Sequence, residues 1–199
     1  NEDGTPTGKG FSKPYCYHID QFESLRPVFM QVMKYARAMG LDMIQGDHED
    51  APGQLELNWM YDDVLRNADR LSTYRQICAQ VAREFNLIAC FMTKPFMGVS
   101  ASGCHTNMSL WTGGKDKVNK LGHKSIPAMD EVFTYVEGGK NTFMPDTKDI
   151  QLPGKIGLKA IGGVMKHLGA LTAIGSSTVN SYRRLWDTGF WAPVYADWG

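Results

Sequence analysis

Apolar residues recur at the spacing of an amphipathic helix in three segments of the chain. Residues 24–39 place them at intervals of three and four, and Gly40 follows, a residue type common just beyond a helix end. Residues 64–85 repeat the pattern, with Asp62 as the expected N-cap. Residues 154–174 carry a third apolar face. The pattern therefore predicts three helices.

Strands are predicted where apolar residues alternate with polar ones or form a short buried run. Four parts of the chain have this character: residues 14–18, residues 41–48 with 53–60, residues 87–93 and residues 104–111. The paired segments enclose a Pro-Gly turn, which predicts a β-hairpin. Residues 112–152 are polar and are interpreted as an excursion or lid with a short helix over 128–136. Together these elements predict one α+β domain in which helices back a largely antiparallel sheet.

The composition is that of an ordinary globular protein, with 199 residues, 43% of them hydrophobic and 21% charged. The formal net charge is zero, so no basic surface is expected to attract nucleic acid or an anionic membrane. No apolar run reaches the length of about 20 residues that a membrane span needs. The four widely spaced cysteines lie among apolar neighbours, which indicates buried, reduced thiols and a cytoplasmic protein.

Two carboxylates flank the turn of the predicted hairpin. Glu49 precedes the Pro-Gly turn and Glu56 follows it, so the hairpin is expected to bring the two side by side. Two acids that converge repel each other unless a proton or a cation lies between them. The alternative is a solvated hairpin whose acids face water, as most charged residues do.

The last predicted strand places His105, Asn107 and Ser109 on one face. Two glutamates and one histidine form a mainly oxygen ligand set, which suits Mg²⁺ or Mn²⁺ at a nucleotide phosphate. Arg183 and Arg184 in the tail are suited to bind a substrate carboxylate or phosphate. These residues together predict a metal-dependent nucleotide site.

Four ordered motifs resemble signatures of the glutamine synthetase superfamily. They are Gly46–Leu57, Lys94-Pro95 with Ser102–Trp111, Gly157–His167 and Thr178–Leu185. The first is similar to the family's HE-x-A-PGQ-x-E, the second to its KPF and GSGMHxHxSLW segments, the third to its Gly-Gly-x-x-Lys-His helix, and the last to its TVNSYKRL. The resemblance extends over residues 46–193 and implies the catalytic-domain fold of that family.

The resemblance implies roles for the matching residues. Glu49 and Glu56 match carboxylates that bind the metal at the glutamate side, and His105 matches an imidazole on the metal that bridges the ATP phosphates. Ser109 matches a nucleotide contact, and Tyr61 falls where an aromatic ring packs near the nucleoside. The implied cofactor is Mg²⁺ or Mn²⁺, with ATP as a co-substrate.

The glutamate pocket of the family also has counterparts in this chain. Arg184 matches the arginine that contacts glutamate and its phosphorylated intermediate, and Ser100, Ala101 and Gly103 lie on the loop that lines the pocket. In that family, ATP phosphorylates the side-chain carboxylate of glutamate, and ammonia then attacks the acyl phosphate. The resemblance therefore implies an ATP-dependent, amide-forming ligase.

Three positions depart from the usual family pattern. Asn107 stands where most members have a second histidine, and Ser100-Ala101 replace Asn-Gly. Trp191 occupies the position of a glutamate that closes over the site and helps to take a proton from ammonium. An indole has no negative charge to bind ammonium and cannot act as its base, but it packs well against a methyl group.

These departures resemble the type III branch of the superfamily, which includes ligases that act on methylamine. The leading prediction is ligation of glutamate to methylamine, giving gamma-glutamylmethylamide, ADP and phosphate. One alternative is glutamine synthesis from ammonia, or ligation of another amine such as ethylamine or a polyamine. The other is a catalytically inactive, structural superfamily member, which retention of Glu49, Glu56 and His105 disfavours.

The resemblance also implies a homododecamer whose sites are shared between adjacent subunits. The chain has no initiator Met and ends abruptly at Trp198-Gly199. Residues 1–199 are therefore expected to be part of a catalytic domain, with the N-terminal domain and a C-terminal remainder absent.

Overall fold

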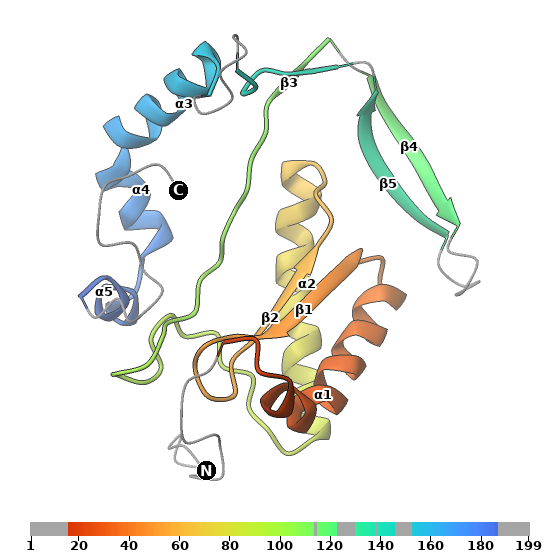
Figure 1. The fold of residues 1–199 in the computed structure, drawn as a ribbon, viewed down its shortest axis with the longest axis vertical. Helices are drawn as coiled ribbons and strands as arrows, with labels where there is room; N and C mark the ends of the chain where they lie inside the picture. Colours follow the sequence, from red (N-terminus) through yellow and green to blue (C-terminus); the bar gives the residue numbers. More distant parts are fainter. Residues whose placement is uncertain (1–15, 114, 123–129, 138, 146–152, 187–199) are drawn as a thin grey trace.

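The computed structural model describes residues 16–113, 115–122, 130–137, 139–145 and 153–186 (Figure 1), with backbone alone for residues 115–122, 130–137 and 186. Two helices and a hairpin form the unit that carries the buried core. The four elements are α1 (Ile19–Ala38), β1 (Met43–His48), β2 (Leu55–Trp59) and α2 (Val64–Glu84). Helix α1 packs against α2 and against β1, and the core lies between them.

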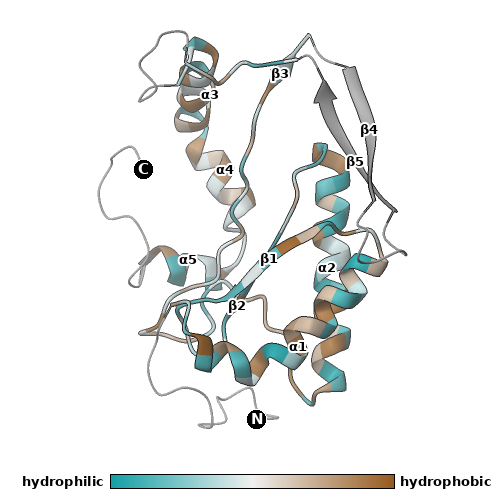
Figure 2. Cartoon of the chain, turned by 45° about the vertical axis from the view of Figure 1, so that its right-hand side comes forward, coloured by the Kyte–Doolittle hydropathy of each residue, from teal (hydrophilic) through white to brown (hydrophobic). Residues whose placement is uncertain are grey.

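The core of this unit comes from the apolar faces that the sequence pattern predicted. Its buried members are Phe29, Val32, Met33, Ala36, Leu41, Met43, Ile77 and Val81. Figure 2 shows hydrophobic and hydrophilic residues interspersed along α1 and α2, as expected for helices with one buried face. Gly46 is required where β1 crosses α1, because an added Cβ there would lie 2.1 Å from the ring of Phe29.

A buried ion pair joins α2 to the start of the hairpin. Arg70 donates to Asp42 at 3.0 Å and lies 3.1 Å from a carboxylate oxygen of Asp62. The side chain of Asp62 is fully buried in this pair, so it does not cap the helix as predicted. The neighbouring Asp63 is the N-cap instead, and its carboxylate accepts from the backbone N–H of Arg66 at 3.0 Å.

The hairpin is antiparallel, as predicted. Asp47 lies opposite Glu56 in its register, and His48 lies opposite Leu55. Residues 49–54 form the turn that connects the strands, with the N–H of Glu49 bonded to the carbonyl oxygen of Gln54 at 2.9 Å. The turn therefore holds the chain on both sides of the Pro-Gly pair in a fixed geometry.

The remaining elements lie away from this core unit in Figure 1. They are β3 (Trp111–Thr112) with β6 (Lys140–Asn141), β4 (Lys115–Gly122) with β5 (Asp130–Glu137), and the helices α3 (Lys155–Lys166), α4 (Leu168–Gly175) and α5 (Val179–Trp186). Both strand pairs are antiparallel. The described sheets therefore agree with the predicted antiparallel α+β class, although each has two strands.

Several predicted strands are wrong. Residues 87–93 and 104–110 pair with no strand in the described part of the chain, and Ile88 is 76% exposed. Apolar character alone does not make a strand, because a ladder also needs a partner. The strand predicted over 14–18 is a turn at residues 16 and 17, and its first two residues lie outside the described ones.

Two helix predictions also need correction. The described part of the helix predicted over 128–136 is strand β5, whose run of β-branched and aromatic residues from Val132 to Val136 favours extended backbone. The helix predicted over 154–174 is divided at His167, which ends α3 and precedes α4. The helices over 24–39 and 64–85 are confirmed as α1 and α2.

The cysteines are free, but the prediction that all four are buried is wrong. Cys90 and Cys104 are exposed, and Cys16 and Cys78 are partly buried. Both exposed thiols lie in the predicted strands that form no ladder, which explains the difference. Among the described helices, none is long and apolar enough to cross a membrane.

Candidate active site

The hairpin brings the two predicted carboxylates together. Glu49 follows β1 directly, and Glu56 lies within β2. A carboxylate oxygen of Glu49 accepts from the N–H of Asp50 at 3.1 Å, and one of Glu56 accepts from the side-chain amide of Asn58 at 3.2 Å. Both glutamates are partly buried, which disfavours the alternative of a solvated hairpin.

The two carboxyl groups share a hydrogen bond. Burial and this bond raise the pKa of Glu49 to about 7. The same bond lowers the pKa of Glu56 below its usual value. Two acids can approach each other when a proton lies between them, and a divalent cation can take the place of that proton. The pair therefore suits a metal ion as the sequence predicted.

His105 lies within electrostatic range of this pair. Its attraction is one cause of the lowered pKa of Glu56. The imidazole is exposed, and Gly103 lies so close that an added Cβ there would be 2.9 Å from its Nε2. Among the described residues, no group of three histidine, cysteine or acidic side chains is arranged to hold a metal. The structure thus brings Glu49 and Glu56 together and leaves His105 within electrostatic range of Glu56.

The loop predicted to line the glutamate pocket is fixed to the hairpin turn. Ser100 is buried, and its hydroxyl donates to the carboxylate of Asp50. The side-chain amide of Gln54 donates to the carbonyl oxygen of Ala101 at 3.1 Å and lies 3.4 Å from the hydroxyl of Ser102. Asp50 and Gln54 had no assigned role in the sequence, although both belong to the motif that carries Glu49.

Helix α5, which carries Arg184, is bonded to residues 93–94, ahead of the same loop. Asn180, in the first turn of α5, accepts from the N–H of Lys94 at 2.6 Å and donates to its carbonyl oxygen at 2.7 Å. The ammonium of Lys94 is buried and donates to the carbonyl oxygen of Val99 at 2.5 Å. Lys94 and Asn180 belong to two of the sequence motifs, but their contact was not predicted, because no local spacing connects position 94 with position 180.

The predicted nucleotide contacts lie on exposed parts of the chain. Tyr61 is 67% exposed, and Asn107 is also exposed. The hydroxyl of Ser109 accepts from the indole N–H of Trp111 at 3.0 Å. Trp191 lies outside the described residues. The roles of these four residues remain predictions.

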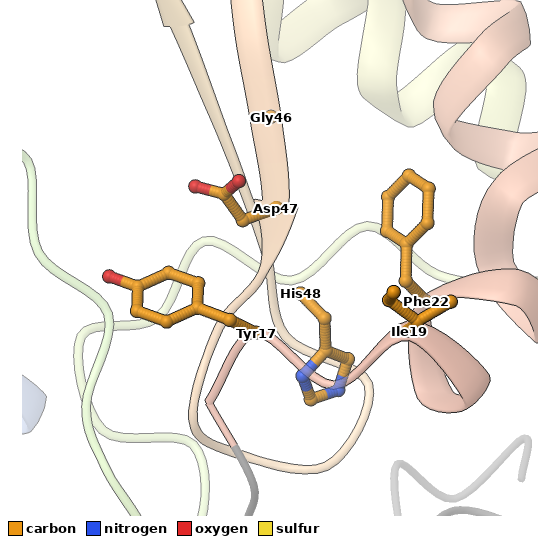
Figure 3. Close-up of a pocket in the computed structure, with 6 residues that line it drawn as sticks. All are labelled: Tyr17, Ile19, Phe22, Gly46, Asp47 and His48. Atoms are coloured by element: carbon orange, nitrogen blue, oxygen red, sulfur yellow. The ribbon is translucent and has the colours of Figure 1, made fainter.

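A separate cavity of about 190 Å³ lies where the start of α1 meets β1 (Figure 3). Its lining residues are Tyr17, Ile19, Phe22, Gly46, Asp47 and His48. Figure 3 shows the side chains of Asp47 and Tyr17 on one side of β1 and that of Phe22 on the other. These six residues include neither Glu49 nor Glu56, so the cavity is distinct from the carboxylate pair.

The family model described as "Glutamine synthetase, catalytic domain" matches residues 3–139 and 133–199 of the chain. The chain belongs to this family. The match includes every described residue of the carboxylate hairpin, the 100–103 loop and α5. Membership confirms the resemblance found in the four sequence motifs.

Known relatives carry two different names. The chain is 32% identical over 188 residues to a glutamine synthetase of Rhizobium meliloti, which covers 92% of this chain and 38% of the relative. It is 32% identical over 197 residues to a glutamate–methylamine ligase of Methyloversatilis universalis, with coverage of 96% and 39%. The chain thus spans less than half the length of these relatives.

Two solved structures share the fold of this chain. The structure titled "Apo GmaS without ligand" superposes with a TM-score of 0.70 at 31% identity, over 92% of this chain and 38% of that one. The structure titled "GmaS/ADP complex-Conformation 1" gives a TM-score of 0.69 at 28% identity, over 96% and 38%. The fold is therefore that of the glutamine synthetase catalytic domain.

Proposed function

We propose that the full-length protein is an ATP-dependent ligase that joins L-glutamate to methylamine through a gamma-glutamyl phosphate. The observation that carries the ligase assignment is the hairpin that brings the carboxylates of Glu49 and Glu56 together, within electrostatic range of His105. The names of the relatives support the reaction class, since both kinds are ligases of glutamate.

Glu49 and Glu56 would hold the divalent cation, Mg²⁺ or Mn²⁺, and His105 would bind on the ATP side. When bound, the cation supplies positive charge that neutralises the phosphate oxygens during phosphoryl transfer. The hairpin holds its two carboxylates close together before any ligand arrives. This arrangement reduces the reorganisation that binding requires.

Arg184 would contact the glutamate carboxylate and then the phosphorylated intermediate. A guanidinium suits this role, because its planar donors match carboxylate and phosphate oxygens. Its Nε is buried and makes no hydrogen bond with the described residues. Ser100, Ala101 and Gly103 would line the same pocket, and Tyr61, Asn107 and Ser109 would contact the nucleotide.

The preference for methylamine rests on Trp191. An indole at this position offers an apolar surface to a methyl group and removes the negative charge that would attract ammonium. The methyl contact contributes only about 1 kcal/mol, so the enzyme would still accept ammonia, as a poorer substrate than methylamine. The relative from Methyloversatilis universalis, named a glutamate–methylamine ligase, supports this assignment.

The assignment is tested by phosphate release from the full-length protein with ATP, Mg²⁺ and glutamate. We expect kcat/KM for methylamine to exceed that for ammonium at least tenfold, which equals about 1.4 kcal/mol of transition-state preference. The variant Trp191→Glu should move the ratio toward ammonium. The ratio is its own control, because it does not depend on the fraction of active enzyme. A parent that prefers ammonium would refute the methylamine assignment.

Glutamine synthesis is the second candidate, because relatives such as that of Rhizobium meliloti carry this name. The same competition between amines decides between the two candidates. A structural, inactive protein is the third candidate, and loss of magnesium-dependent ATP binding in the full-length protein would favour it.

We further propose that residues 1–199 form part of a larger catalytic domain and that the active enzyme is a homododecamer with shared sites. The coverage of 38% of the relatives' length supports the first point. The isolated chain should then release no phosphate, whereas the full-length protein should do so as a large ring.

A further inference from the structure

Residues 93–102 run between the carboxylate hairpin and α5 (Figure 1). At one end, the amide of Gln54 in the hairpin turn donates to the carbonyl oxygen of Ala101 at 3.1 Å. At the other end, Asn180 of α5 binds the backbone of Lys94. The two parts of the candidate active site are therefore connected through this one segment.

The bonds of Asn180 use both ends of its carboxamide. The Oδ1 accepts from the N–H of Lys94 at 2.6 Å and from the hydroxyl of Thr93 at 3.0 Å. The Nδ2 donates to the carbonyl oxygen of Lys94 at 2.7 Å. Two opposed bonds to one residue fix both the distance and the rotation of α5 relative to that backbone. A carboxylate of the same shape cannot do this, because it has no donor.

Arg184 lies four residues after Asn180 on α5, and residues at this spacing share a helix face. The face that is bonded to Lys94 is therefore the face that presents Arg184. Both side chains are partly buried, whereas Tyr182, Arg183 and Leu185 are exposed. The position of Arg184 relative to the loop at Ser100 thus depends on how α5 is bonded to residues 93–102.

We propose that Asn180 is a positioning residue for the ligase reaction. It holds α5 so that Arg184 reaches the substrate bound at the hairpin side of the site. This inference rests on the proposed function, because it assigns Arg184 to the substrate. Asn180 itself contacts backbone and the Thr93 hydroxyl, so it acts through the arginine.

The test compares Asn180→Ala and Asn180→Asp with Thr178→Ala in the full-length enzyme. The hydroxyl of Thr178 accepts from the N–H of Ser181 at 3.2 Å, so its loss weakens the start of α5 without touching Lys94. We expect both Asn180 variants to raise KM for glutamate roughly tenfold to a hundredfold, because a small displacement of a binding group costs this much. Thr178→Ala should change KM for glutamate less than about twofold. In all three variants, KM for ATP should also change less than about twofold.

A double-mutant cycle separates positioning from general damage. In an Arg184→Lys background, Asn180→Ala should cost less than about a further twofold in kcat/KM for glutamate, because the effect is transmitted through the arginine. The same loss in both backgrounds would overturn the proposal. So would an Asn180→Ala variant with the parent's KM for glutamate.

Hydrogen exchange gives a readout that does not require activity. Peptides covering residues 93–102 should exchange faster in Asn180→Ala than in the parent, whereas Thr178→Ala should affect only peptides from α5. Equal exchange of residues 93–102 in both variants would refute the anchor. An inactive parent would refute the proposed function instead. A parent that prefers ammonium would refute only the choice of amine, because the role of Asn180 can then be tested with ammonium as the substrate.

Discussion

Arg70→Met should destabilise the protein far more than the loss of an exposed ion pair. Arg70 is 7% exposed and neutralises the two buried carboxylates of Asp42 and Asp62, at 3.0 and 3.1 Å. Removing one partner of a buried pair costs about 3–5 kcal/mol, because a buried charge is left without compensation. Asp62 keeps a second partner, because Arg66 lies 3.1 Å from the same carboxylate, so the charge left without compensation is that of Asp42.

The assay is urea unfolding of the full-length protein, followed by circular dichroism. Arg26→Met is the matched control, since Arg26 pairs with Glu23 at 2.8 Å while both side chains are more than half exposed. Exposed pairs contribute about 0–1 kcal/mol, so this variant should be close to the parent. Equal midpoints for Arg70→Met and Arg26→Met would refute the reasoning.

The replacement of all three buried charges sharpens the test. A variant with Arg70→Met, Asp42→Asn and Asp62→Asn no longer buries an ion, so it should recover part of the stability lost in Arg70→Met. If the triple variant were less stable than the single one, the cause would be lost packing or hydrogen bonding at Arg70 and not an uncompensated charge.

Two further predictions concern the core unit. Burial raises the pKa of the Cys78 thiol from 9.0 to about 11, so its contribution to stability is complete below pH 9 and is lost as the pH rises toward 11. This loss is about 2–3 kcal/mol. The urea midpoint should therefore fall less between pH 8 and pH 11 in Cys78→Ala than in the parent, and an equal fall in both proteins would contradict the prediction. Gly46→Ala places a methyl group 2.1 Å from the ring of Phe29 and should cost about 1–3 kcal/mol. Gly162→Ala, with nothing within 4 Å, should instead stabilise α3 by about 0.5–1 kcal/mol; equal unfolding midpoints for the two variants would exclude the clash.

The features that the sequence predicted well depend on neighbours along the chain. The apolar periodicity of residues 24–39 and the Pro-Gly turn between Glu49 and Glu56 are both local signals, and both appear as expected. The convergence of the two carboxylates follows from hairpin geometry alone.

The features that the sequence did not predict depend on distant partners. Residues 104–110 alternate like a strand, but a strand also requires a partner, and the described chain provides one only at Trp111 and Thr112. The choice of Asp63 over Asp62 as the N-cap depends on Arg70, which takes Asp62 into a buried pair. The bonds from Gln54 to the 100–102 loop connect positions 47 and 48 residues apart, and no local spacing indicates them.

The contact between Asn180 and Lys94 has a consequence for the order in which the chain folds. It closes a loop of 86 residues, whereas the hairpin and the helices around it form from nearby segments. Closing such a loop costs about 4 kcal/mol of chain entropy, comparable with the gain from its three hydrogen bonds. The anchor is therefore favourable only after the intervening elements have folded. A chain caught earlier would contain an intact hydrophobic core and two separated halves of the candidate active site, so assembly of the core and assembly of that site are distinct events.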